Sequence, residues 1–265
     1  MKAIKRTLLQ LGRSLLPSKL KLFVLHYIIA ILNPKERQRA NWFYNMTNMK
    51  WTLQNIKRCG HELNQIIDVG AYEGEWTEEV IRIFPNARSL MVEGQPTKEP
   101  LLRTVVDRNN GQVDYAITLV GASPNDTVEF YEMETGSSVL YEQCDANRKK
   151  VTRSMTTVDL LVEKHNIKSI DLLKIDVQGY ELEVLRGATN ALAISELVLL
   201  EVSLLPIIKG APLMPETVRF MDERGFVPYE VCNLMRRPLD DALWQVDMVF
   251  VKKTSKLIAN HTKGS

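Results

Sequence analysis

Cysteine and net charge are both scarce in this sequence. Only three of its 265 residues are cysteines, and Cys59, Cys144 and Cys232 lie too far apart for a disulfide framework or for paired metal ligands. The formal net charge is +2, which gives no argument for a nucleic-acid partner, because such binding needs a concentrated basic face. We therefore expect a cytoplasmic protein with reduced thiols that does not bind nucleic acid.

The sequence also lacks an apolar run long enough to cross a bilayer. Its most apolar stretch, residues 22–32, counts 11 positions, whereas a spanning helix needs about 20. The length suits a signal-peptide core, but the preceding basic region is long and no small-residue cleavage site precedes Asn33. The first acid is Glu36, so residues 1–32 form a basic amphipathic segment. Two alternatives stay open: peripheral contact with the inner face of a membrane, or a helical arm packed on its own domain or on a partner subunit.

Three regions of the chain differ in pattern. Residues 1–60 are expected to be a helical extension, because Pro34 suits a helix start and Gly60 a helix stop. Residues 61–253 alternate strand and helix patterns, and with 45% hydrophobic residues the chain can bury one large α/β core. Residues 254–265 are expected to be an unstructured tail. The oligomeric state stays open.

The α/β region predicts a mostly parallel sheet with helices on both faces. Strands are expected at residues 65–68, 89–93, 113–117, 170–175, 197–202, 226–231 and 244–251. Helices are expected at residues 76–84, 98–108, 158–165, 181–186 and 216–224. The last two strands are able to pair antiparallel at a sheet edge. An insertion at 121–156 is expected to form a hairpin from residues 127–131 and 136–140.

A glycine turn follows the first expected strand. Asp68 ends that strand, and Gly70 and Gly74 precede a helical pattern. Glycines suit a tight turn that a ligand approaches closely, and the amides of the next helix would point at that ligand. A dinucleotide turn has a further glycine between these two, so NAD and an oxidoreductase are the weaker interpretation. Glu93 ends the second strand, 93 − 68 = 25 residues after Asp68, where doubly wound folds hold ribose hydroxyls.

A second group of charges lies on the expected strand at 170–175. Lys174 and Asp176 point to one face because side chains alternate along a strand, and burying such a pair costs roughly several kcal/mol per ion. Asp176 falls at the carboxyl edge of the sheet, where α/β folds bind ligands, and Glu201 reaches that edge on the next strand. The pattern favours a functional site over a structural ion-pair network.

Two motifs resemble the FkbM family of S-adenosylmethionine-dependent methyltransferases. One is the glycine turn with Glu93, which is similar to a class I methyltransferase cofactor site, and the other is Leu173–Ala188, flanked by Thr156–Leu160 and Glu201–Ser203. The likeness covers residues 63–251. It implies a Rossmann-like class I fold with a seven-stranded sheet, S-adenosylmethionine as cofactor, and O-methylation of a hydroxyl on a sugar, a free or lipid-linked glycan, or a related natural product.

The resemblance also implies which residues form the site. The cofactor is expected to contact Asp68, Gly70, Ala71, Tyr72, Gly74, Glu93, Gly94, Ala116 and Asp176. The acceptor is expected near Gly136, Ser137, Ser138, Gln178, Glu181 and Ser203. After the third strand, residues 116–118 offer no acid that could accept the adenine amino group.

Methyl transfer to a hydroxyl needs a group that takes its proton. No histidine is expected at the carboxyl edge of the sheet; the four are His26, His61, His165 and His261. We therefore expect Asp176 to be the base or a metal ligand, Lys174 to hold its charge, and Glu201 to lie next to the acceptor. Two carboxylates can hold Mg²⁺, but no third ligand is recognisable, so no metal is predicted. A catalytically inactive cofactor-binding or scaffold protein on the same fold is the alternative.

Overall fold

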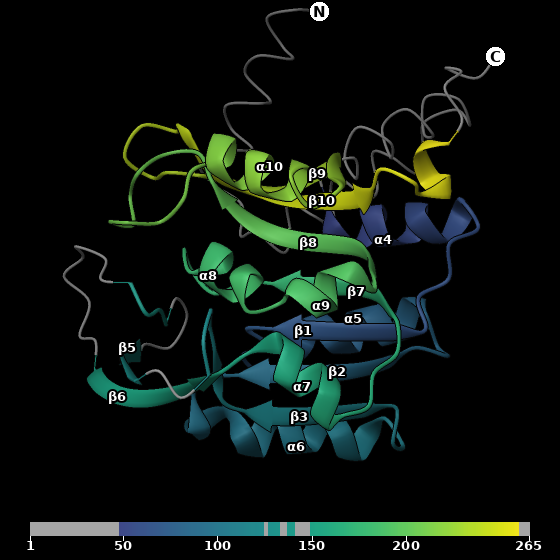
Figure 1. Ribbon diagram of the computed structural model, residues 1–265, viewed down its shortest axis with the longest axis horizontal. Helices are drawn as coiled ribbons and strands as arrows, with labels where there is room; N and C mark the ends of the chain where they lie inside the picture. Colours follow the sequence, from purple (N-terminus) through teal and green to yellow (C-terminus); the bar gives the residue numbers. More distant parts are fainter. Residues whose placement is uncertain (1–47, 125–126, 133–136, 141–148, 260–265) are drawn as a thin grey trace, which may run out of the picture. The chain divides into compact units, whose positions relative to one another are not determined.

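The computed structural model describes residues 48–124, 127–132, 137–140 and 149–259 (Figure 1). The expectations for residues 1–32, for Gly136 and for the end of the tail lie outside these residues. Within them, helix α4 (Met49–Arg58) begins at Asn48, whose side chain accepts the amides of Lys50 and Trp51. Gly60, at φ 80°, follows the end of this helix as predicted. No helix among the described residues is long and apolar enough to span a membrane.

One seven-stranded sheet organises the chain, in the order β3-β2-β1-β7-β8-β10-β9 (Figure 1). The first five strands in this order pair in parallel, whereas β10 pairs antiparallel with both β8 and β9. The predicted α/β fold of the Rossmann-like class I type is confirmed, including its antiparallel edge. The strands are β1 (Gln65–Val69), β2 (Arg88–Glu93), β3 (Val113–Ile117), β7 (Ile170–Ile175), β8 (Ser195–Ser203), β9 (Phe226–Arg236) and β10 (Leu243–Lys252).

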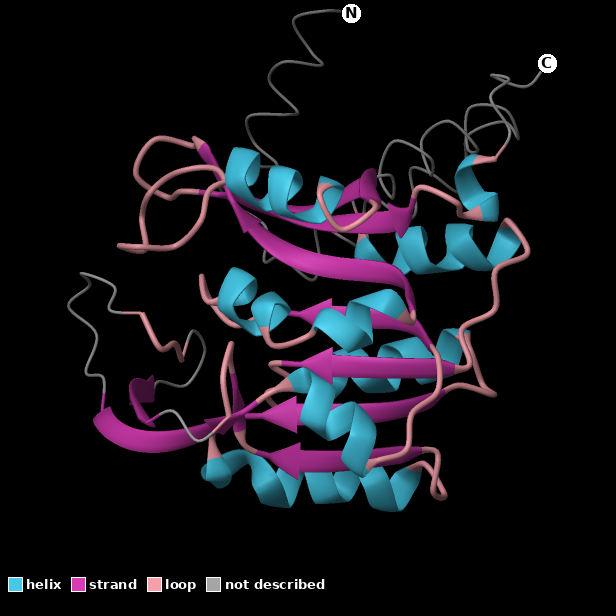
Figure 2. Cartoon of the chain, viewed as in Figure 1, coloured by secondary structure: helices cyan, strands magenta, loops and turns pink. Residues whose placement is uncertain are grey.

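Helices cover both faces of the sheet (Figure 2). One hydrophobic cluster packs α4 with α5 (Glu75–Ile83) and α6 (Glu99–Arg108). The other packs α7 (Val158–Lys164), α8 (Glu181–Arg186), α9 (Thr189–Ala193) and α10 (Met214–Asp222). Strand side chains alternate between the two clusters, so Leu199 joins the first and Leu200 the second. By the same alternation, Glu201 lies on the α4–α6 face.

The insertion after β3 forms a second, three-stranded sheet in the order β4-β6-β5. Its strands are β4 (Leu119–Val120), β5 (Thr127–Glu132) and β6 (Lys149–Thr156), and β5 pairs antiparallel with β6. Among the described residues 137–140 of the expected hairpin, Ser138 forms an antiparallel bridge with Tyr131 of β5. The longer pairing of β5 is with β6, which the sequence did not predict, because alternation identifies a strand but does not say what it pairs with.

The segment after β10 also departs from its prediction. Residues 254–265 were expected to be unstructured, but Lys256–Ile258 form a 3₁₀ helix, η2, capped by the buried Ser255. Leu257 and Ile258 pack against the α4–α6 cluster. The domain therefore continues to at least Ile258, because these two apolar side chains cover the end of the core.

Candidate active site

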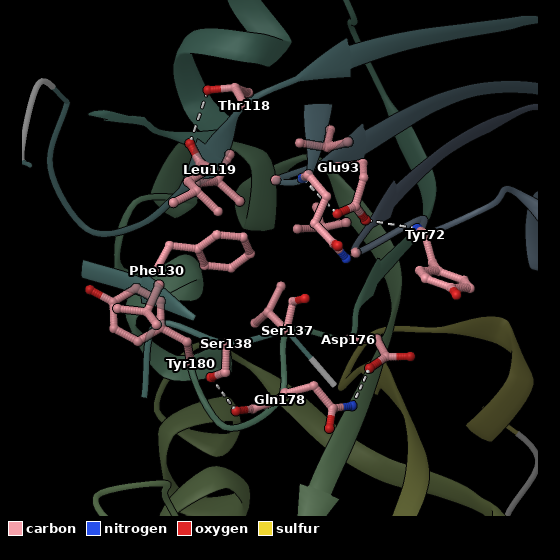
Figure 3. Close-up of a pocket in the computed structure, with 18 residues that line it drawn as sticks. Tyr72, Glu93, Thr118, Leu119, Phe130, Ser137, Ser138, Asp176, Gln178 and Tyr180 are labelled. Atoms are coloured by element: carbon pink, nitrogen blue, oxygen red, sulfur yellow. Dashed lines mark hydrogen bonds between the residues drawn. The ribbon is translucent and has the colours of Figure 1, made fainter. Parts of the chain in front are cut away.

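A cavity of about 250 Å³ opens at the carboxyl edge of the parallel strands. The ends of β1, β2 and β7 form one side, and the insertion forms the other. Figure 3 shows Leu119 and Phe130 at one end of the cavity, Tyr72 and Asp176 at the opposite end, and Glu93 between them. The lining residues expected from the sequence are Gly70, Tyr72, Glu93, Gly94, Ser137, Ser138, Asp176 and Gln178.

The glycines of the turn are required by the packing of the protein itself. Gly70 has φ 79°, and a Cβ there would lie 1.8 Å from the backbone oxygen of Asp176, where β1 and β7 end side by side. Gly74 has φ 82° and begins α5; a Cβ would meet Met91 and Val105 at 3.0 Å. Both glycines have the left-handed backbone expected of a tight turn, and both make room for neighbouring parts of the protein. Gly70 also lines the cavity, so the close approach of a ligand to this turn stays a prediction.

The backbone amides of the turn are also occupied within the protein. Gly70 and Ala71 both donate to the carbonyl of Val92, at 2.9 and 3.1 Å, and Tyr72 donates to Glu93 Oε2 at 2.8 Å. These three donors are not available to a pyrophosphate, which weighs against a dinucleotide. The amides at the start of α5, which were expected to point at a ligand, are not among the three, so that expectation stays a prediction.

Glu93 is a buried carboxyl group that faces the cavity. Only 6% of the residue is exposed, and its oxygens accept the amides of Tyr72 and Gln95, at 2.8 and 2.9 Å. Burial raises the pKa of Glu93, and these two amides oppose the shift. Each oxygen keeps a lone pair, so the carboxylate can accept two neighbouring hydroxyls such as those of a ribose.

Asp68 does not line the cavity, although it was expected to contact the cofactor. Its carboxyl group is fully buried. It accepts the Thr77 hydroxyl at 2.7 Å and the Lys174 ammonium at 2.9 Å. Asp68 therefore ties β1 to α5 and β7, and its partner Lys174 likewise lies outside the cavity lining.

Lys174 contacts two carboxylates from the α4–α6 face of the sheet. Its ammonium lies 2.9 Å from Asp68 Oδ1 and 3.6 Å from Asp176 Oδ2. Burial alone would lower the pKa of Lys174, but the charges of Asp68 and Asp176 more than offset it, so the pKa lies above its ordinary value. The expected pair with Asp176 exists, but the shorter contact is with Asp68.

Asp176, Gln178 and Glu201 meet at the ends of β7 and β8. Asp176 lines the cavity with its side chain 36% exposed, whereas Glu201 is only 8% exposed and does not line it. The Gln178 amide donates to Asp176 Oδ1 at 3.2 Å and to Glu201 Oε2 at 2.8 Å. Burial, followed by the charge of Asp176, raises the pKa of Glu201 well above its ordinary value. The shared edge of Asp176 and Glu201 is confirmed.

Four further expected residues lie outside the cavity lining: Ala71, Gly74, Ala116 and Ser203. Glu181 is also outside it, because its carboxyl group turns back to accept the amides of Val177 and Gly179. Burial raises the pKa of Glu181 to about 7. The residues after β3 that line the cavity are Thr118 and Leu119, two and three positions beyond Ala116.

The sequence reasoning missed most of the apolar wall of the cavity. Leu119, Val120, Phe130, Val139 and Tyr180 line it, and Phe130 packs with Leu119 in a small cluster of the insertion. The alternating pattern of β5 was a usable signal, because an apolar side chain on a short polar strand needs a surface to cover. An apolar end and a buried acid suit a nucleoside, whose base is flat and whose ribose carries a diol.

Neither of the two described histidines lies at this cavity. His165 lies before β7, 3.3 Å from Asp114 at the start of β3, and neither it nor His61 lines the cavity. His26 and His261 lie outside the described residues. Among the described residues no group of three or more histidine, cysteine and acidic side chains could hold a metal ion.

Comparisons with known proteins agree with the geometry. The profile of the Methyltransferase FkbM domain matches residues 68–228. A curated protein, Methyltransferase 1 of Beauveria bassiana (strain ARSEF 2860), is 27% identical over 142 residues, which are 46% of this chain and 57% of that protein. The chain thus matches little more than half the length of this curated relative.

Two solved structures match the chain at low identity. A methyltransferase FkbM from Methylobacillus flagellatus KT is 14% identical, with a TM-score of 0.43, over 71% of this chain and 44% of that chain. Aeropyrum pernix fibrillarin, solved with natively bound S-adenosyl-L-methionine, is 16% identical, with a TM-score of 0.44, over 78% of this chain and 76% of that chain.

Proposed function

Because the chain belongs to the FkbM methyltransferase family, we propose that it transfers a methyl group from S-adenosylmethionine to a hydroxyl group of a sugar, a glycan or a related natural product. The observation that carries the proposal is Glu93, a buried carboxyl group that ends β2 and faces a cavity with one apolar end. The occupied amides of the glycine turn support an adenosyl ligand over a dinucleotide.

The residues of the cavity fit this cofactor. Leu119 and Phe130 would cover the adenine, and Glu93 would accept the two ribose hydroxyls. Asp176, at the opposite end, would attract the positively charged amino acid and sulfonium part. No acid follows β3 to bind the adenine amino group, so the Thr118 hydroxyl and backbone carbonyls are left to do so.

Methyl transfer then depends on the alignment of the acceptor oxygen with the methyl group and on one general base. S-adenosylmethionine, when bound, would supply the methyl group to the acceptor oxygen, and its sulfur would keep the electron pair of the broken carbon–sulfur bond. Asp176 accepts the proton that the hydroxyl loses, and Lys174 limits the repulsion between this carboxylate and its acidic neighbours. Holding the acceptor in line can contribute about 7–11 kcal/mol, and a base about 10²–10⁴-fold in rate.

A hydroxyl acceptor is favoured by the polar groups beside Asp176. Ser137 and Gln178 line the cavity, and the serine hydroxyl and the side-chain oxygen of Gln178 can pair with the other hydroxyls of a polyol. A lipid-linked glycan would also give the basic segment 1–32 a role at the inner face of a membrane. Loss of that segment is then expected to abolish partitioning onto anionic vesicles, measured by co-sedimentation.

The test has a binding part and a transfer part. Titration calorimetry with S-adenosylmethionine should give one site per chain, and methyl-labelled cofactor should label one member of a panel of sugar nucleotides and lipid-linked glycans. Binding without transfer to any acceptor would favour the inactive scaffold. Absence of binding would contradict the proposal itself.

Asp176→Asn should separate chemistry from binding. At saturating S-adenosylmethionine we expect it to lose about 10²–10⁴-fold in turnover, because the amide cannot accept the proton. The lost attraction between Asp176 and the cofactor should appear separately, as weaker binding in the calorimetric titration. Asp114→Asn, at the opposite edge of the sheet, is the matched control and should keep full turnover. Full turnover in Asp176→Asn would exclude this carboxylate as the base.

A further inference from the structure

Gln178 joins the two acidic strand ends through a single side-chain nitrogen. Its Nε2 donates one hydrogen to Asp176 Oδ1 at 3.2 Å and the other to Glu201 Oε2 at 2.8 Å (Figure 3 shows the first of these bonds). An amide nitrogen carries two hydrogens, so both bonds exist together. Each of the two carboxyl groups therefore presents an oxygen acceptor, and not a proton, to Gln178.

The backbone of Gln178 is held in an unusual conformation by the insertion. Its φ is 55°, in the left-handed region that glutamine rarely adopts. The carbonyl of Gln178 accepts the Ser138 hydroxyl at 2.8 Å, and that hydroxyl in turn accepts the Leu140 amide at 3.0 Å. Ser138 is only 3% exposed, so this contact is fixed within the wall of the cavity. A strained backbone that side-chain contacts hold in place is typical of functional sites.

Charges of both signs surround Asp176. Lys174 of β7 lies 3.6 Å away, but Asp68 holds its ammonium more closely. Glu201 of β8, Asp247 of β10 and Glu181 of α8 add three carboxyl groups, and Asp176 raises the pKa of each of them after burial itself. Without a donor between them, Asp176 and Glu201 would lower their repulsion by sharing a proton.

We propose that Gln178 is the positioning residue that keeps Asp176 a free proton acceptor, and that Ser138 fixes Gln178 in place. The inference rests on the proposed function. The amide donates a hydrogen bond to one oxygen of each carboxyl group. The two carboxyl groups therefore do not need to share a proton across those oxygens. The second oxygen of Asp176 stays available beside the Lys174 ammonium, at the end of the cavity where the acceptor hydroxyl must lie.

The direct test measures the protonation of Asp176 without any acceptor. In protein labelled with ¹³C at aspartate carboxyl carbons, the Asp176 signal is assigned by its loss in Asp176→Asn and followed against pH. Gln178→Met, which keeps the length but removes the donor, should raise the pH midpoint of this signal by about one unit or more. Gln112→Met is the matched control, because Gln112 donates to Pro85 away from the cavity. It should leave the midpoint unchanged.

A second variant keeps the test decisive if Gln178→Met fails to fold. Gln178→Asn keeps an amide and suits the left-handed backbone, but one methylene less prevents it from spanning both carboxyl groups. It should fold, shift the Asp176 midpoint in the same direction, and move the acid limb of the kcat/KM profile to higher pH. A purely structural role would lower activity equally at every pH.

Two outcomes separate this inference from the proposed function. An unmoved Asp176 midpoint in the folded Gln178→Asn variant overturns the inference, even if the wild-type chain methylates its acceptor. If the midpoint rises but the chain binds no S-adenosylmethionine, the positioning role of Gln178 is supported. The methyltransferase function that we propose for the chain is then overturned.

Discussion

Glu93 is the residue through which pH should act on cofactor binding. Its carboxyl group accepts hydroxyl hydrogens best when it is ionised, and burial raises its pKa. Affinity for S-adenosylmethionine should therefore fall as the pH drops, beginning at a higher pH than for an ordinary glutamate. Titration calorimetry across this range measures the effect.

Glu93→Gln should remove that pH dependence together with part of the affinity. The amide keeps one acceptor oxygen and loses a charged hydrogen-bond partner, so we expect about 10–100-fold weaker binding at neutral pH. Glu62→Gln, an exposed position before β1, is the control and should bind as the wild-type chain does. Equal affinity in Glu93→Gln would show that the ribose does not rest on this carboxylate.

At this same scale, the sequence predicted which residues gather but not which partner each one takes. The spacing placed Lys174 and Asp176 on one face of a strand, and they do form an ion pair. It could not reveal that Asp68, on the adjacent β1, comes closer to the ammonium, because strand order depends on long-range pairing. For the same reason the sequence assigned Asp68 to the ligand.

At the scale of the element, the contact between β1 and β7 depends on Gly70, which has no side chain. A Cβ at Gly70 would lie 1.8 Å from the Asp176 carbonyl oxygen, so Gly70→Ala must push the two strand ends apart. We expect a loss of roughly 3 kcal/mol or more in the free energy of unfolding, with weakened cofactor binding. Urea denaturation followed by circular dichroism gives the value.

Gly111→Ala separates this contact from backbone strain. Gly111 has φ 79° as Gly70 does, but a Cβ there would meet nothing within 4 Å. Gly111→Ala should lower the free energy of unfolding only by the cost of holding alanine in the left-handed conformation, about 1–2 kcal/mol. Equal losses in the two variants would mean that the left-handed conformation, and not the close approach of β1 and β7, makes Gly70 necessary.

Periodicity predicted regular elements well and irregular ones poorly. The observed bounds of β3, β7 and α8 are those expected, since each is a run of one pattern ended by a clear signal. Helix α9, five residues long, was missed because it is too short to show a period. The partner of β5 was missed because pairing across an insertion leaves no local trace.

For the whole molecule, buried carboxyl groups should make stability depend on pH. Burial raises the pKa of Glu181 to about 7, whereas the unfolded chain releases that proton near 4.5. Between these values the native state holds more protons than the unfolded state, so the free energy of unfolding falls as pH rises and levels off above about 7. This one group accounts for a change on the order of 3 kcal/mol.

Glu181→Gln should flatten this dependence. Its amide oxygen can still accept the amides of Val177 and Gly179, but it has no proton to release. Urea midpoints measured from pH 5 to pH 8 should decline less steeply than in the wild-type chain, with the exposed Glu163→Gln as the control. An unchanged slope would assign the pH dependence to Glu201 and Asp247 instead.

The close approach of Gly70 and Asp176 also determines how the cavity can admit a ligand. These two strand ends are in van der Waals contact within the central sheet, and neither can retreat without breaking ladder hydrogen bonds on both sides. The side of the cavity that the strand ends form is therefore rigid. The opposite wall is joined to this side by the hydrogen bond from the Ser138 hydroxyl to the Gln178 carbonyl.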